Sequence, residues 1–300
     1  MQIVHTYSIV AHEPATGRLG AAVQSHWFNV GDVIGVEAGV GAVASQSLAS
    51  FDYGPLIVER LRAGEDAGEA LGARLAEDDD RGVRQVAVVT PDGSAVHTGD
   101  RCIAHAGHRQ RRDYCTAANL MARPTVWDAM GEAYENTEGP LSHRLMAALE
   151  AGQSEGGDVR GMQSCALLVV SGEPSGKPWA DKIVDIRVDD HPDPLGELRR
   201  SLEVGRAYDF MVEGEALLAE GRFEEALAAH REAIVLAPDR PEVAFWTAVN
   251  HAAVGDVDAA LPLFRRCFED HDGWRELVPR LVAPGILPDD AALLRRIRDL

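Results

Sequence analysis

The sequence is poor in lysine, in long apolar runs and in targeting signals. Its only two lysines are Lys177 and Lys182, and arginine supplies the rest of the positive charge. No run approaches the roughly eighteen apolar residues that a membrane helix needs. The N-terminus has no charged region followed by an apolar stretch, so no secretory signal is predicted. We therefore predict a cytoplasmic protein with no membrane partner.

Basic residues are outnumbered by acidic ones, 29 to 48, so the formal net charge is −19 at pH 7. Such a surface repels the phosphates of nucleic acids, which argues against a nucleic-acid partner. One short basic run, residues 109–112, interrupts the acidic pattern and could bind an anion locally. We interpret this run as a solvated loop.

Patterns that would bind a metal or a cofactor are also missing. The four cysteines form no C-x-x-C pair and no zinc spacing, so we expect reduced core residues at Cys102, Cys115, Cys165 and Cys267. The histidines at 97, 105 and 108 have no diagnostic ligand spacing. No glycine motif that would cradle a phosphate is present. We predict neither a metal nor a cofactor.

Residues 6–11 carry the clearest local pattern in the chain. They alternate hydroxyl-bearing residues with apolar or aromatic ones, which is typical of a strand with one face toward a core. Thr6 and Ser8 therefore point to the same side of the sheet. A turn containing Pro and Gly follows, and residues 19–25 return as a second strand. This hairpin would bring Ser25 near one end of the first strand.

Strands and helices alternate in blocks over the first 195 residues. Helical spacing of apolar residues predicts two short helices within 54–78 and a second pair at 124–136 and 140–151. Further strands are predicted at 33–36, 40–47, 84–89, 95–99, 102–106, 114–120, 164–170 and 183–188. This order is typical of antiparallel sheet segregated from helices, so we predict an α+β layered domain.

Two prolines within residues 191–194 stop regular structure and mark a predicted boundary between domains 1–195 and 196–300. Beyond it the pattern is helical. The sequence of residues 221–227 is similar to that of residues 255–261, which gives an internal repeat with a period of 34. With small residues at helical spacing, this segment strongly resembles the tetratricopeptide repeat. Two units and a last helix are predicted at about 207–240, 241–270 and 289–300. Because isolated pairs of repeats are seldom stable, we expect support from the first domain or a second subunit, and predict a homo-oligomer.

Several short motifs of the first domain occur in the order typical of one family. They are residues 6–11 (TYSIVA), 22–25 (AVQS), 39–47 (GVGAVASQS), 97–99 (HTG), 156–164 (GGDVRGMQS) and 185–191 (DIRVDDH). Over about residues 4–200 the chain resembles the domain of unknown function 1028. The resemblance implies an N-terminal-nucleophile (Ntn) hydrolase-like fold, a four-layer αββα sandwich. It implies no settled substrate.

The chemistry of such hydrolases makes Thr6 the candidate nucleophile. A hydroxyl needs a base to remove its proton, and a free α-amino group with a pKa near 8 is a suitable one. Thr6 can use its own amino group only after residues 1–5 are lost, through cleavage between His5 and Thr6. Neither lysine lies near Thr6 in sequence. A histidine or arginine would have to take the place of the lysine that proteasome-like members use, although arginine is a poor proton acceptor. The alternative interpretation is a strand hydroxyl that caps its neighbours.

Other polar residues of the motifs are candidates for the same site. Ser8 is an alternative nucleophile, Ser25 could line the pocket, and Gln46 could bind a substrate amide or be a buried amide satisfied by backbone. The substrate-binding candidates on the glycine-flanked loop and beyond it are Asp158, Arg160 and Gln163. The Arg160 guanidinium could bind a carboxylate of the substrate. Alternatively, Asp158 and Arg160 could form a pair that only shapes the loop.

These observations predict an Ntn-type amidohydrolase or peptidase that acts on a small amide or peptide bond. Backbone N–H groups with Gln46 or Ser25 would form the oxyanion site, and the repeats would bind a partner or drive oligomerisation. The alternative is a catalytically silent Ntn-like scaffold or ligand-binding protein whose repeats recruit a protein partner.

Overall fold

The computed structural model describes residues 2–300, and their side chains from residue 4 onward. The chain divides into two compact units, residues 1–200 and 201–300, which are described separately. Among the described residues, no helix combines the length and apolar character that crossing a membrane requires.

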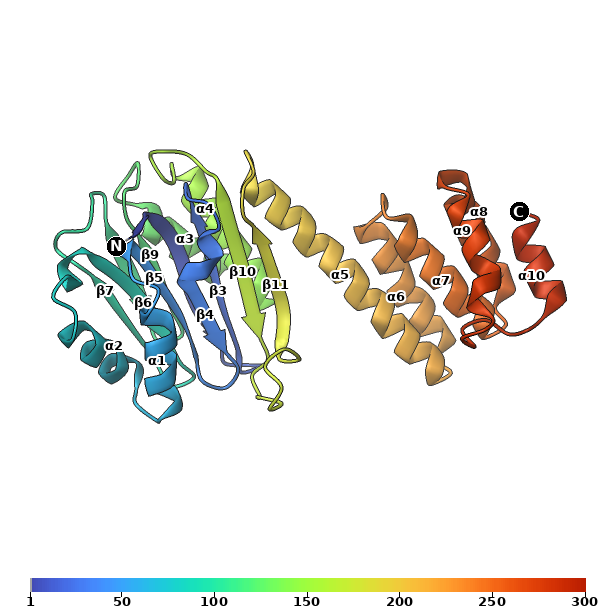
Figure 1. Ribbon diagram of the computed structural model, residues 1–300, viewed down its shortest axis with the longest axis horizontal. Helices are drawn as coiled ribbons and strands as arrows, with labels where there is room; N and C mark the ends of the chain where they lie inside the picture. The colour runs from blue at the N-terminus through green and yellow to red at the C-terminus, as the bar shows by residue number, and fades with distance from the viewer. Residues whose placement is uncertain (1) are drawn as a thin grey trace. The chain divides into compact units, whose positions relative to one another are not determined.

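Two antiparallel sheets form the centre of the first unit (Figure 1). The larger sheet has the order β11 (Lys182–Val188), β10 (Ser164–Val170), β3 (Arg18–Ser25), β2 (Thr6–Glu13), β9 (Tyr114–Ala118) and β8 (Gly107–Arg111). In the smaller sheet, β5 (Gly41–Ala49) pairs with β6 (Arg84–Val89), which pairs with β7 (Ser94–Thr98). The short strands β1 (Gln2–Val4) and β4 (Ile34–Glu37) both pair with β5.

A pair of helices covers the outer face of each sheet. Helices α1 (Tyr53–Arg62) and α2 (Ala67–Ala76) pack on the smaller sheet, and α3 (Val126–Asn136) and α4 (Leu141–Ser154) pack on the larger one. Between the sheets, alanines alternate with branched residues, such as Val10, Ala42 and Ala87. Small side chains let the two sheets approach closely, and each strand therefore buries its inward face. The layers confirm the predicted α+β class.

The N-terminal segment crosses from one sheet to the other at a single residue. Strand β1 ends at Val4 in the smaller sheet, and β2 begins at Thr6 in the middle of the larger one. His5 therefore lies at the crossing, and the peptide bond between the buried residues His5 and Thr6 connects the two sheets. This topology positions the candidate site.

Most predicted strands are confirmed, but residues 102–106 are not a strand. The Cys102 N–H donates to the Gly99 carbonyl within a turn, and the Ile103 carbonyl accepts from Leu120, so the segment has no ladder partner. The next strand is β8 instead, which contains most of the basic run predicted as a solvated loop. The run is therefore largely strand and not loop. Residues 110–112 are exposed as predicted, but the Arg109 side chain is largely buried and binds Glu135 on α3, with Nη2 and Oε2 2.7 Å apart.

The second unit is helical throughout. Its helices are the later part of α5 (Pro194–Ala219), then α6 (Phe223–Leu236), α7 (Pro241–Ala253), α8 (Val257–Asp270), the short α9 (Gly273–Leu277) and α10 (Ala291–Arg298). Gly221 and Gly255, with φ of 76° and 88°, form the turns before α6 and α8. Residues 189–193, which include Pro192, have no regular structure between β11 and α5, and Pro194 is the first residue of α5. Proline suits that position, and the Asp193 carboxylate caps the helix by accepting from the Gly196 N–H.

Candidate functional site

Three of the predicted site residues meet at the N-terminal end of β2. Thr6 is paired with Ser25 across the ladder of β2 and β3. The amide of Gln46, on β5 of the other sheet, donates to the Thr6 carbonyl over 3.2 Å. Thr6, Ser8 and Ser25 have no exposed surface, and Gln46 is 1% exposed. A polar cluster is therefore enclosed between two sheets at a place where most folds bury only apolar side chains.

Two donors converge on the carbonyl oxygen of His5, which immediately precedes Thr6. The Ser25 hydroxyl donates to it over 2.6 Å, and the Arg160 Nη2 donates over 2.9 Å. One neutral and one charged donor polarise this carbonyl and favour negative charge on its oxygen. In acyl-transfer enzymes in general, donors placed in this way stabilise the oxyanion of the tetrahedral intermediate.

Asp158 holds the Arg160 side chain in place. Arg160 Nε lies 3.0 Å from Asp158 Oδ1, and Arg160 Nη2 lies 2.6 Å from Oδ2, so the pair is bidentate. Asp158 is buried and its own loop is shaped by Gly156, Gly157 and Gly161, all with positive φ. The carboxylate therefore orients the guanidinium, and Nη2 still reaches His5. The Asp158–Arg160 pair therefore shapes the loop and also presents a donor to the cluster.

The carbonyl oxygen of Thr6 is held as firmly as that of His5. It accepts from Gln46, from the Asn119 side chain over 3.3 Å and from the Asn119 N–H over 3.1 Å. Gln46 Nε2 and Asn119 Nδ2 both donate as well to Gln85 Oε1, at 2.7 and 2.9 Å. The Thr6 hydroxyl donates back along the chain to the Val4 carbonyl over 3.0 Å. The peptide bond between His5 and Thr6 is therefore fixed by hydrogen bonds on both sides.

The His5 imidazole fills the remaining space in the cluster. Its Nδ1 lies 2.7 Å from Asn119 Oδ1, and the residue is 2% exposed. Burial lowers the pKa of His5 below its usual value, against the opposing effect of the hydrogen bond with Asn119. A neutral ring is therefore favoured. Sequence reasoning missed Asn119 and Gln85, and the one available signal was the polar Gln85 directly before the apolar residues 86–89 of β6.

Several buried polar atoms beside Thr6 have no hydrogen-bond partner. They are Ser8 Oγ, Gln46 Oε1, Ser47 Oγ and the Nε2 of His5. Ser47 is also a non-glycine residue with a φ of 75°, a conformation that costs energy in a strand. Unsatisfied and strained groups of this kind cluster at functional sites more often than elsewhere in a core.

Gln163 does not join the cluster with its side chain. Its N–H donates to the Ser25 carbonyl, but its side-chain amide donates to Asp190 over 3.1 Å. The histidines at 97 and 108 also bond within the protein, His97 to the Arg81 carbonyl and His108 to Thr98. In the described part of the chain, no group of three or more His, Cys, Asp or Glu side chains could hold a metal ion.

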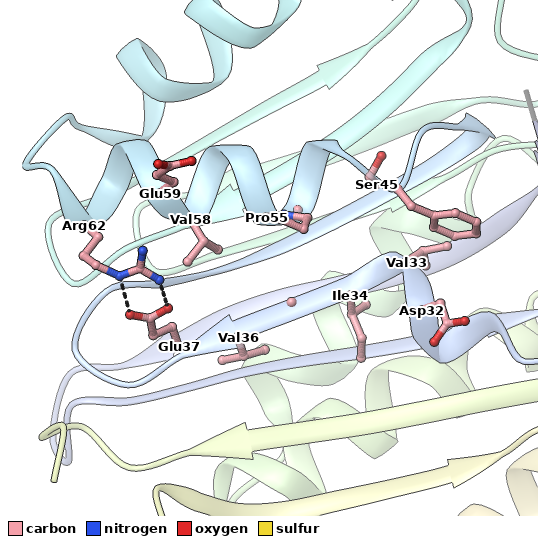
Figure 2. Close-up of a pocket in the computed structure, with 13 residues that line it drawn as sticks. Asp32, Val33, Ile34, Val36, Glu37, Ser45, Pro55, Val58, Glu59 and Arg62 are labelled. Atoms are coloured by element: carbon pink, nitrogen blue, oxygen red, sulfur yellow. Dashed lines mark hydrogen bonds and ion pairs between the residues drawn. The ribbon is translucent and has the colours of Figure 1, made fainter. Parts of the chain in front are cut away.

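A separate open pocket of about 720 Å³ lies between α1 and β4 (Figure 2). Ile34, Val36 and Val58 give it an apolar lining, and Arg62 binds Glu37 at one end, with Arg62 Nε 2.9 Å from Glu37 Oε1. None of the predicted site residues lines this pocket. The predicted site and the open pocket are therefore different places in the fold.

The fold and the cluster define the class of the first unit, an α+β domain with two facing antiparallel sheets and an enclosed polar site. Residues 6–198 match the profile of the family of unknown function DUF1028, and the chain belongs to this family. A solved relative is the crystal structure of protein SPO2555 from Silicibacter pomeroyi, which is assigned to the same family. It is 30% identical, with a TM-score of 0.60 over 66% of this chain and 85% of that chain. No curated protein matches the chain.

Proposed function

We propose that this protein is an Ntn-type amide hydrolase that cleaves its own chain between His5 and Thr6 and then uses Thr6 as its nucleophile. The observation that carries the proposal is the pair of donors on the His5 carbonyl oxygen, from Ser25 and Arg160. The layered order of helices, sheet, sheet and helices supports an Ntn-hydrolase-like fold.

In the first step, Thr6 Oγ1 attacks the carbonyl carbon of His5. The negative charge that develops on the His5 oxygen is stabilised by the Ser25 hydroxyl and the Arg160 guanidinium. The bond from carbon to the Thr6 nitrogen breaks, and the hydroxyl proton ends on that nitrogen as the leaving amine. Water then hydrolyses the ester, which leaves a carboxylate on residue 5 and a free amino group on Thr6.

In the mature chain, the α-amino group of Thr6 serves as the base for its own hydroxyl. Its ordinary pKa is near 8, so a useful fraction is unprotonated at neutral pH. A substrate amide binds with its carbonyl where the His5 carbonyl lay, and the same two donors stabilise the oxyanion. Thr6 forms an ester with the acyl group, the amine leaves, and water releases the acid. The substrate class is a small amide or peptide.

The helical unit has a second role in this proposal. Its helical hairpins end at the predicted repeat boundaries, and Gly221 and Gly255 occupy equivalent turns, which supports two tetratricopeptide repeats. Such repeats bind a peptide or protein partner or a second copy of the chain. A deletion of residues 201–300 that removes a captured partner or the dimer supports this role.

Hydrolysis of an amide and peptide library by the purified full-length chain tests the proposed activity. We expect activity to be abolished in Thr6→Ala and retained in Thr6→Ser. Thr16→Ala, which changes an exposed threonine of the hairpin turn, is the matched control and should keep full activity. Equal activity in Thr6→Ala and the wild type contradicts the proposal. No activity in either chain would favour the catalytically silent scaffold, in which the buried Thr6 hydroxyl only caps the Val4 carbonyl.

A further inference from the structure

The segment before the proposed cleavage point is bound as an extended strand. In β1, Gln2 is opposite Ala49, Ile3 is opposite Leu48 and Val4 is opposite Ser47, all in antiparallel pairing with β5. A strand that adds to a sheet edge gains its affinity from main-chain hydrogen bonds and its specificity from alternate side chains. Once residues 1–5 leave, this part of the β5 edge has no strand beside it.

Two side chains of the segment occupy defined places. Val4 is fully buried in an apolar cluster that includes Val23, Val33 and Ala49. His5 is 2% exposed, and its Nδ1 lies 2.7 Å from Asn119 Oδ1. Because Gln85 accepts from Asn119 Nδ2, the amide oxygen of Asn119 is turned toward the imidazole. These contacts select a small branched side chain followed by a planar ring that can donate a hydrogen bond.

We infer that residues 2–5 occupy the substrate site of the mature enzyme. The inference rests on the proposed function, because the His5 carbonyl already lies between the two oxyanion donors and next to the Thr6 hydroxyl. The substrate class is then an extended peptide, or a peptide-like amide, with histidine on the acyl side of the cleaved bond and valine before it. Cleavage consumes one water and yields the peptide carboxylate and the free amine. Asn119 is the residue that determines the preference for histidine.

Binding of the product peptide tests this site independently of catalysis. The probe is acetyl-Gln-Ile-Val-His with a free carboxylate, titrated calorimetrically into a chain that lacks residues 2–5, after its fold is checked by circular dichroism. We expect this peptide to bind at least tenfold more tightly than the same peptide ending in alanine. Asn119→Ala should abolish that difference. Equal binding of both peptides, or no binding of either, overturns the inference.

A second measurement uses the full-length chain and covers the case in which the shortened chain does not fold. His5→Ala should slow the appearance of the Thr6 N-terminus at least tenfold, because residue 5 then loses its bond to Asn119. An unchanged rate overturns the inference but leaves the proposed hydrolase intact. If the wild-type chain is never cleaved and the peptide still binds with its histidine preference, the proposed hydrolase fails and the peptide site stands.

Discussion

Arg160 Nη2 lies 2.9 Å from the carbonyl oxygen of His5, although 155 residues separate them in the chain. A guanidinium in this position supplies a positively charged donor to the carbonyl oxygen of the residue that precedes Thr6. Asp158 fixes its orientation, so the geometry exists before any reaction begins. Loss of this charged donor, or of the neutral donor Ser25, should therefore slow cleavage between His5 and Thr6.

Replacement of Arg160 by lysine should slow cleavage between His5 and Thr6 by about a hundredfold or more, as expected for loss of one oxyanion donor. A lysine cannot bind Asp158 through two nitrogens and reach His5 at the same time. The rate is measured as the fraction of chains starting at Thr6 over time. Arg280→Lys, an exposed arginine in the second unit, is the control and should have no effect. Equal rates in Arg160→Lys and the wild type would exclude a role for the guanidinium.

Ser25→Ala should slow the same cleavage by a similar factor, since it removes the donor at 2.6 Å from the His5 oxygen. Ser25 is fully buried, so a water molecule can take the place of the lost hydroxyl only if the cluster opens. Thermal unfolding should be measured alongside, to separate loss of the donor from loss of the fold. A stable Ser25→Ala chain that is cleaved at the wild-type rate would assign the oxyanion role to Arg160 alone.

The second unit should become less stable in acid because of His230. Burial, reinforced by the neighbouring His251, lowers the pKa of His230 to about 4. An unfolded chain, with an ordinary histidine pKa near 6.5, binds the proton first as the pH falls. The free energy of unfolding should therefore decrease between about pH 6.5 and pH 4, by up to about 3 kcal/mol, and change little from this group below that range.

Hydrogen exchange of the α6 and α7 amides in the full chain measures this loss. His230→Gln should remove most of the pH dependence, and His26→Gln, at an exposed histidine of the first unit, should leave it unchanged. If the free energy of unfolding of the His230→Gln chain falls as much over the same pH range, a group other than His230 titrates.

Two glycines of α5 should respond in opposite directions to alanine. A Cβ on Gly214 would lie 2.1 Å from His230 Nε2, within a packed core, so Gly214→Ala should destabilise the second unit by more than about 1 kcal/mol. Gly205 has open space, and Gly205→Ala should stabilise its helix by about 0.5–1 kcal/mol through backbone entropy. Urea unfolding of both variants gives the comparison. Equal effects would contradict the packing around His230.

The sequence predicted the parts of the site that depend on local structure. Thr6 and Ser25 face each other because one hairpin joins them, and the alternation along residues 6–11 fixes which side chains point inward. Gln46 was a candidate because it follows a strand of small residues. The strand expected at 102–106 failed because strand-like composition does not provide a partner strand.

The rest of the site depends on contacts between distant segments, which leave no local pattern. Asn119 and Gln85 enter the cluster only because β9 and β6 lie against each other across the two sheets. Arg160 was recognised as a candidate, but its bond to His5 required the fold. Gln163 was placed in the site by its position in the motif, and its amide turns to Asp190 instead.

The N-terminal residue of the mature protein tests the central claim most directly. Intact mass spectrometry of the full-length chain, purified at neutral pH, should give a wild-type mass that corresponds to a chain beginning at Thr6. The Thr6→Ala variant, purified in parallel, should keep residues 2–5. A wild-type chain that also keeps residues 2–5, and that cleaves no amide, contradicts self-cleavage and the use of Thr6 as the nucleophile.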